Sequence, residues 1–138
     1  MVGVRIFMHQ LIKDDLTEME CQQLIRDFRK YKEGKGLPAT FGRDVPYDHT
    51  FNRQYVQLQH IHIKRNGQRF PVRVVQFNRT SGSVLVYCPG YFDKNAYLLI
   101  AIAKHFNPRK PNEINDTDRD TELMAIFEQI AEGFRERF

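Results

Sequence analysis

Between residues 55 and 104, short apolar runs alternate with pairs of turn-forming residues, which confines this part of the chain to a β-sheet. The runs cover residues 55–64, 72–79, 84–88 and 96–104. The turns between them are Asn66-Gly67, Ser81-Gly82 and Pro89-Gly90, the first two at hairpin spacing. This order predicts an antiparallel meander. Residues 97–103 are apolar at every position, which suits a central strand covered on both faces or, alternatively, a buried helix.

Helical patterns flank this central region. Residues 2–8 form an apolar, β-branched run that predicts a first strand. A helix is expected to follow, capped by Asp15 or Thr17 and ended near Gly34, and apolar residues of a second helix recur on one face over 123–134. Residues 37–50 are rich in turn formers and are expected to be irregular. The 138 residues predict one α+β domain over residues 1–138, a sheet of four to five strands between an N-terminal and a C-terminal helix.

The compartment is predicted from cysteine usage and from the lack of targeting signals. Cys21 and Cys88 are two cysteines far apart in a chain long enough for an apolar core, which favours reduced thiols over a disulfide framework. The first residues lack the uninterrupted apolar segment of a signal peptide, and no run approaches the roughly 20 residues of a membrane span. We therefore expect a cytoplasmic protein without a membrane partner.

The net charge of +4 is distributed unevenly along the chain. Residues 1–50 hold eight basic and eight acidic side chains, residues 51–110 hold ten basic and one acidic, and residues 111–138 hold three basic and eight acidic. A cationic central segment suits contact with a polyanion, because Lys and Arg neutralise phosphates and release counterions. The alternative is an ordinary surface with an excess of basic residues. We favour contact with nucleic acid.

His60 and His62 are two residues apart, so in a strand both imidazoles leave the same face. Such a pair could act as general base and general acid while a ribose 2′-hydroxyl attacks the adjacent phosphate. It could also bind a metal, but no third ligand stands at a recognisable spacing, or it could simply belong to a hydrogen-bonded sheet face. The apolar side of this run changes between Leu58 and Ile61, which predicts either a β-bulge or burial on both faces.

Basic residues around the histidines could bind phosphate. Arg73 and Arg79 share one face of the run 72–79, and Arg79 lies next to the Ser81-Gly82 turn, where a phosphate could approach its guanidinium. Surface ion pairs are the alternative, but Asp93 is the only acidic partner in the central segment. Further basic residues that could contact RNA are Arg43, Lys64, Arg65, Lys104, His105, Arg109 and Lys110.

Three more residues have two interpretations each. Tyr87 could stack on a base or donate a phenolic hydrogen bond to the substrate, or it could be part of the core. Asp44 and Asp48 could orient the substrate or a catalytic histidine, or they could close turns through their side chains. No glycine-rich phosphate loop and no G-x-S-x-G motif is present, so nucleoside triphosphate and serine hydrolase chemistry have no support.

An ordered series of short motifs runs through the chain and resembles the YafO family of toxins. Its members are Phe41-Gly42-Arg43-Asp44, Tyr47-Asp48, His60-Ile61-His62, Gln76-Phe77, Arg79-Thr80, Leu85-Val86-Tyr87-Cys88, Gly90, Phe92-Asp93, Leu98-Leu99-Ile100-Ala101-Ile102 and Phe134-Arg135 with Arg137-Phe138. No single motif is specific, but the combination is. The resemblance implies a type II toxin–antitoxin system, a cognate antitoxin of the YafN kind, and a compact RelE-like fold with a twisted antiparallel sheet.

The same resemblance implies a ribosome-dependent endoribonuclease that cuts mRNA without a metal or other cofactor. The 2′-hydroxyl attacks, a cation stabilises the charged phosphorane, and a 2′,3′-cyclic phosphate remains. Arg79 is the expected cation, with Lys104 or Arg43 as substitutes. Assignment of acid and base to His60 and His62 comes from strand geometry. The alternatives are a non-catalytic module that binds RNA or the ribosome, and a structural protein that acts through its acidic C-terminal helix.

Overall fold

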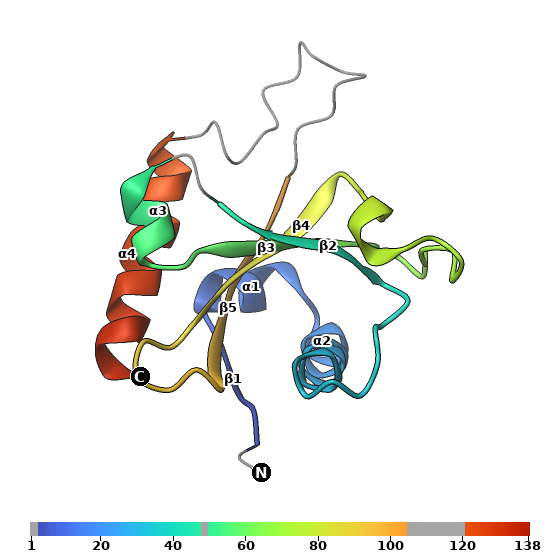
Figure 1. The fold of residues 1–138 in the computed structure, drawn as a ribbon, viewed down its shortest axis with the longest axis horizontal. Coiled ribbons are helices and arrows are strands. Elements are labelled where there is room, and N and C mark those ends of the chain that lie inside the picture. Colours follow the sequence, from blue (N-terminus) through green and yellow to red (C-terminus); the bar gives the residue numbers. More distant parts are fainter. Residues whose placement is uncertain (1–2, 48–49, 105–120) are drawn as a thin grey trace.

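A five-stranded sheet organises the chain, and its strand order is β1-β5-β4-β3-β2 (Figure 1). The computed structural model describes residues 3–47, 50–104 and 121–138. The strands are β1 (Arg5–Met8), β2 (Phe41–Pro46), β3 (Gln59–Ile63), β4 (Ser83–Pro89) and β5 (Ala96–Lys104). Strands β2 to β5 form an antiparallel meander, in which β2 takes the place of the strand predicted at residues 72–79. Strand β1 joins the edge of β5 in parallel. The predicted α+β class is confirmed, and the sheet is mixed because of β1.

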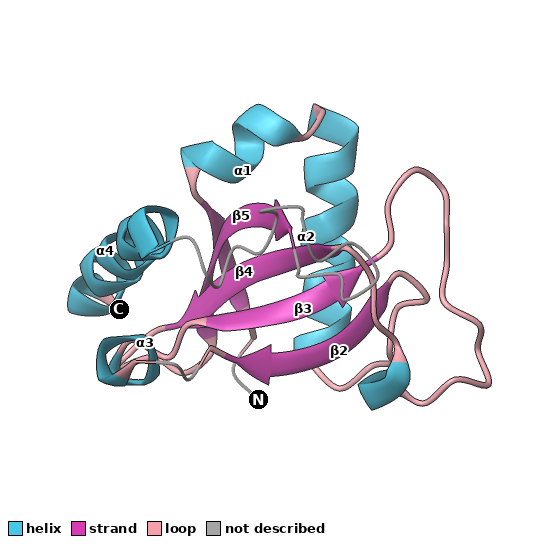
Figure 2. Ribbon diagram, turned by 90° about the horizontal axis from the view of Figure 1, so that it is seen from above, coloured by secondary structure: helices cyan, strands magenta, loops and turns pink. Residues whose placement is uncertain are grey.

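Helices cover both faces of the sheet (Figures 1 and 2). They are α1 (Gln10–Asp15), α2 (Glu18–Lys32), α3 (Phe51–Tyr55) and α4 (Thr121–Arg137). Ile12 of α1 and Phe28 of α2 pack with Ile61 of β3 in one core cluster. Met124 and Phe127 of α4 pack with residues of β4 and β5 in the other cluster. We call these the α2 side and the α4 side of the sheet.

Burial on both faces explains the change of apolar side in β3. Ile61 is buried on the α2 side, and Leu58 is buried on the α4 side. The register shifts of this sheet lie in β2, between Phe41 and Asp44, and in β5, between Leu99 and Ala101, opposite Tyr87 and Val86 of β4. Of the two explanations open from the sequence, burial on both faces is therefore correct for β3, and the bulge explanation is wrong.

Local signals set the start and end of α2 as predicted. The Thr17 hydroxyl accepts a hydrogen bond from the Glu20 N–H at 3.2 Å, and the Glu20 carboxylate accepts one from the Thr17 N–H at 3.0 Å. This reciprocal pair is a capping box, which satisfies amides that have no partner inside the helix. Gly34 follows the last turn with a φ of 73°, a conformation that glycine adopts without strain.

Three of the predicted elements are wrong. Residues 72–79 form an irregular loop with one 3₁₀ turn at Gln76–Asn78 instead of a strand, so the Asn66-Gly67 turn leads into a loop and not a hairpin. Residues 41–46 form the edge strand β2 within the stretch expected to be irregular. The strand predicted from residue 55 begins at Gln59, because the hydroxyl of Thr50 accepts from the N–H of Arg53 and caps the short helix α3.

Candidate functional site

The imidazoles of His60 and His62 lie side by side on the α4 side of the sheet. Their cross-strand partners are Val86 and Val84, both in the core cluster on that side. The two ring centroids are 6.1 Å apart. The His60 ring also stacks on Tyr47, with centroids 4.0 Å apart and an angle of 18° between the planes. Only 6% of His60 and 1% of His62 is exposed, so both rings lie beneath other side chains.

A backbone contact fixes the orientation of the His62 ring. The Ser81 N–H donates a hydrogen bond to Nδ1 of His62 at 2.9 Å. The same Nδ1 lies 3.1 Å from the Ser81 carbonyl oxygen, so the Ser81 backbone offers this nitrogen both a donor and an acceptor. Ser81 is itself held by its hydroxyl, which lies 2.7 Å from the Ile63 carbonyl oxygen and 2.8 Å from that of Ser83. The turn after the irregular loop therefore positions one histidine of the pair.

Arg79 is buried inside the loop over residues 64–82, which we call the basic loop. Its guanidinium donates to the carbonyl oxygens of Val74 at 2.8 Å, Val72 at 3.3 Å and Phe41 at 3.3 Å. These bonds use carbonyls that a strand would pair with a neighbouring strand, which explains why residues 72–79 are irregular. The structure thus gives Arg79 a structural environment, with 6% exposure, rather than an open phosphate site.

Tyr87 and Asp44 lie on the α2 side, so the sheet separates them from the histidines. The Tyr87 hydroxyl donates to the Asp44 carboxylate at 2.8 Å, and the Tyr31 hydroxyl donates to it at 2.7 Å. The Lys32 ammonium donates to the Tyr87 oxygen at 3.0 Å and lies 3.7 Å from Asp44. Gln76 completes this polar cluster by donating to the Tyr31 oxygen at 2.9 Å. The prediction that Tyr87 joins the histidine site has no support in this geometry.

Burial governs the titration of the polar cluster. Desolvation raises the pKa of Tyr87 well above its ordinary value, and the nearby Asp44 carboxylate raises it further. Desolvation lowers the pKa of Lys32, and the attraction of Asp44 opposes this effect. No sequence pattern distinguishes Lys32 or Tyr31, since both lie in the last turn of α2 beside other basic residues. Gln76 belongs to the Gln76-Phe77 motif of the family resemblance, and this motif is the sequence feature that could have identified Gln76 as a site residue.

The remaining predicted cations are dispersed over the surface. Arg43 donates from Nε to the Phe77 carbonyl at 2.6 Å, and its guanidinium carbon is 4.1 Å from the centre of the Phe77 ring. Lys64 lies over the ring of Phe70 at 5.3 Å. Arg65 is partly buried in the basic loop, and Arg73 there and Lys104 at the end of β5 are exposed. The other predicted site residues, Asp48, His105, Arg109 and Lys110, lie outside the described residues.

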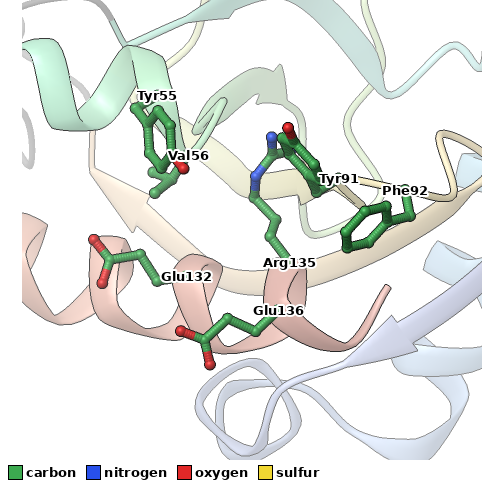
Figure 3. Close-up of a pocket in the computed structure, with 7 residues that line it drawn as sticks. All are labelled: Tyr55, Val56, Tyr91, Phe92, Glu132, Arg135 and Glu136. Atoms are coloured by element: carbon green, nitrogen blue, oxygen red, sulfur yellow. The ribbon is translucent and has the colours of Figure 1, made fainter.

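A second surface, the aromatic groove, lies between α3, α4 and the turn after β4 (Figure 3). Its volume is about 300 Å³, and it is lined by Tyr55, Val56, Tyr91, Phe92, Glu132, Arg135 and Glu136. Phe92 is 79% exposed, and the carboxylates of Glu132 and Glu136 extend from α4 along the rim. Arg135 is buried at the base and donates to the Pro89 carbonyl at 3.0 Å. Its residues come from three separate segments of the chain, so the sequence patterns do not predict this surface.

Neither a metal centre nor a membrane segment was found in the described part of the chain. No three His, Cys, Asp or Glu side chains gather there as metal ligands would. None of its helices combines the length and the apolar character required to cross a bilayer. Cys21 and Cys88 are buried free thiols, and burial raises the pKa of Cys88 to about 12.

The mixed sheet between two helical layers, with a histidine pair beside a basic loop, agrees with the class predicted from the motifs, a toxin of a type II toxin–antitoxin system. Residues 29–136 match the family described as "Toxin YafO, type II toxin-antitoxin system". The chain is also 39% identical to the mRNA interferase toxin YafO of Escherichia coli (strain K12), over 98% of this chain and the whole of that protein. The chain belongs to the YafO family. No solved structure matches it.

Proposed function

We propose that this YafO-family chain is an mRNA interferase that cleaves RNA by attack of a ribose 2′-hydroxyl, without a metal. Its relative from Escherichia coli carries the name mRNA interferase toxin, and the two chains align over nearly their full lengths. The observation that supports the chemistry is the pair of imidazoles on one face of β3. Two rings with centroids 6.1 Å apart can each reach a different oxygen of one phosphate group by a hydrogen bond.

In this reaction His60 accepts the proton of the 2′-hydroxyl while its oxygen attacks phosphorus. His62 donates its Nε2 proton to the 5′-oxygen as the bond from phosphorus to that oxygen breaks. The products are a 2′,3′-cyclic phosphate and a free 5′-hydroxyl, and the two rings have exchanged their protonation states. The acid is the imidazolium form of His62, which carries a proton on both ring nitrogens. The Ser81 carbonyl oxygen lies 3.1 Å from Nδ1 and can accept the Nδ1 proton while Nε2 gives up its own.

Arg43 is the better candidate for the cation that stabilises the phosphorane. Arg79 donates to three backbone carbonyls and is a positioning residue in this proposal. Arg43 lies two residues before Val45, the cross-strand partner of His60, and the residue is only partly buried. Its guanidinium, 4.1 Å from the centre of the Phe77 ring, would contact a phosphate over the two histidine rings after leaving Phe77.

Burial of the histidine pair supports dependence on the ribosome. RNA reaches rings that are 6% and 1% exposed only after covering side chains such as Tyr47 move. A message held on the ribosome is already oriented, which reduces the entropic cost of bringing the scissile phosphate to the site. The proposed partners are therefore the translating ribosome and its mRNA, in the cytoplasm.

A translating extract tests this proposal. The purified protein should create new 5′ ends in mRNA that ribosomes engage, and a chelator should not prevent it. His62→Ala should abolish these ends, whereas His9→Asn, a control that keeps a side-chain acceptor at the cap of α1, should not. If the wild-type protein binds ribosomes and produces no new ends, it is the non-catalytic ribosome-binding module instead. Full cleavage by a folded His62→Ala protein would remove the histidine from the site.

The second proposed partner is an antitoxin of the YafN kind, and the aromatic groove is its proposed docking surface. Phe92, Tyr91 and Tyr55 offer exposed aromatic area, which marks protein interfaces. Residues 111–138 carry eight acidic and three basic side chains, and Glu132 and Glu136 on the rim repel RNA phosphates. The charge therefore favours a protein segment that places Lys or Arg beside an apolar side chain.

Neutralisation of toxicity tests this surface. The antitoxin encoded next to the toxin gene should rescue growth when it is expressed with the wild-type toxin. Phe92→Ala should weaken the purified complex by about tenfold or more, as expected for an interface anchor, and Met19→Ala should not. Met19 is the matched control because it is 80% exposed on α2, away from the groove. Unchanged antitoxin affinity of Phe92→Ala would exclude the groove.

A further inference from the structure

Phe77 is a large aromatic side chain that the core does not use. It belongs to the 3₁₀ turn of the basic loop and is 63% exposed. Two more apolar residues of the same loop, Val72 and Val75, are 88% and 63% exposed. Three large apolar side chains exposed within six residues are not explained by packing, since a monomer gains nothing by presenting such a patch to water.

The Phe77 ring is already held in place by an arginine. The guanidinium carbon of Arg43 lies 4.1 Å from the ring centroid, close enough for a stacked cation–π contact. The Nε of the same arginine donates to the Phe77 carbonyl at 2.6 Å, so side chain and backbone are fixed together. The loop that carries Phe77 also carries Ser81, whose N–H donates to His62, so this loop contacts the proposed reaction site.

The basic loop itself is built to be rigid. Arg79 ties Val72, Val74 and Phe41 together through three backbone carbonyls. The Arg43 N–H donates to the Arg79 carbonyl at 2.9 Å, which joins the loop to β2. A preorganised loop loses little conformational entropy when a ligand binds to it.

The charge around Phe77 selects a polyanion. The sequence holds no Asp or Glu between Asp48 and Asp93, and the basic loop carries one lysine and four arginines. Among the described residues, a second highly exposed phenylalanine, Phe92, has the opposite surroundings, with Glu132 and Glu136 on the same rim. Single-stranded RNA is recognised through aromatic rings and guanidinium planes that stack on its bases, with basic residues at its phosphates.

We propose that Phe77, backed by Arg43, is a stacking site for one unpaired base of single-stranded RNA. The inference rests on the proposed function in one respect, since the base is taken to belong to the mRNA that is cleaved. Stacking alone selects any base, because every base has an aromatic face. The site thus anchors the message on the loop that contacts His62, and it contributes little to the choice of sequence.

Binding of a fluorescently labelled RNA oligomer without secondary structure, followed by anisotropy, tests this site. Phe77→Ala should weaken binding by about tenfold, and loss of one stacked base spans roughly fivefold to more than a hundredfold. Phe77→Tyr and Phe77→Trp should retain wild-type affinity, since each keeps an aromatic face. Met19→Ala is the control, because Met19 is 80% exposed on α2 and belongs to no proposed site, and it should bind RNA as the wild-type protein does. The salt dependence of RNA affinity separates phosphate contacts from base stacking. Arg73→Ala should reduce the slope of log affinity against log salt concentration by about one, and Phe77→Ala should leave that slope unchanged.

Three results would overturn the stacking site: wild-type RNA affinity of Phe77→Ala, failure of Phe77→Tyr to retain affinity, or loss of antitoxin binding by Phe77→Ala with unchanged RNA binding. The last result would make the patch a protein interface. Failure of the proposed function looks different, because it appears as intact mRNA in the translating extract. RNA binding that depends on Phe77 would still support the stacking site in that case.

Discussion

Replacing Arg79 with alanine should cost this protein a large part of its folding stability. The guanidinium donates three hydrogen bonds to the carbonyls of Val74, Val72 and Phe41, and the residue is 6% exposed. A hydrogen bond to a charged group contributes about 1.5–3 kcal/mol, so three independent bonds would give about 5–9 kcal/mol. Val72 lies in an exposed loop, and water can reach its carbonyl once the side chain is gone. We therefore expect a loss of about 3–5 kcal/mol, out of a typical total of about 5–15 kcal/mol.

Urea unfolding followed by far-ultraviolet circular dichroism measures this loss, since the chain has no tryptophan to report it. Arg79→Lys is the matched variant, because it keeps the charge but loses the planar fork that serves several carbonyls at once. It should fall between the wild-type protein and Arg79→Ala. A wild-type urea midpoint for Arg79→Ala, combined with lost RNA cleavage, would refute the structural role and restore Arg79 as the cation that contacts the phosphate.

Three other predictions concern the framework of the site. Gly42→Ala should lower the free energy of unfolding in urea by about 1–3 kcal/mol, because a Cβ at Gly42 overlaps the carbonyl oxygen of Arg79. An unchanged urea midpoint would mean that the basic loop shifts freely. Thr17→Ala should lower the free energy of unfolding by about 1 kcal/mol in the same measurement, whereas Thr17→Ser should lower it little. Equal losses for the two variants would mean that the hydroxyl does not stabilise the start of α2. Burial raises the pKa of Tyr87, so above pH 10 the unfolded chain releases this proton first and stability falls by up to about 1.4 kcal/mol per pH unit. Tyr87→Phe should flatten that fall, and an identical slope would contradict burial of the phenol.

The elements that the sequence predicted correctly are those set by neighbours in the chain. The Thr17 and Glu20 pair caps α2 from within four residues, and the uninterrupted apolar run of 97–103 requires the two-sided cover that β5 receives. The C-terminal helix is set by an apolar face that recurs every three to four residues and packs through Met124 and Phe127. None of these predictions needed knowledge of a distant partner.

The errors come from contacts between distant residues. The run 72–79 has the composition of a strand, but Arg79 folds back on its own loop and binds carbonyls there and in Phe41, 38 positions away. The grouping of Tyr87 with the histidines failed for a related reason. Within one strand, the alternation of side chains shows which residues share a face. Which residues of two different strands share a face depends on how the strands pair, and the sequence does not show that pairing. In the structure His60 is opposite Val86, which turns Tyr87 to the other side of the sheet.

Exposed phenylalanine occurs in two surroundings of opposite charge, and this has a consequence for how a partner could silence the toxin. Phe77 lies in a loop without acidic residues, whereas Phe92 shares a groove with carboxylates of α4. An antitoxin in the groove would therefore not need to compete with RNA for Phe77. The antitoxin would instead contact α4. Met124 and Phe127 of this helix pack in the same core cluster as Val84 and Val86, which lie opposite the two histidines in the sheet. Since those histidines are buried in the free protein, stabilising this packed arrangement would suppress cleavage while the basic loop stays open to RNA.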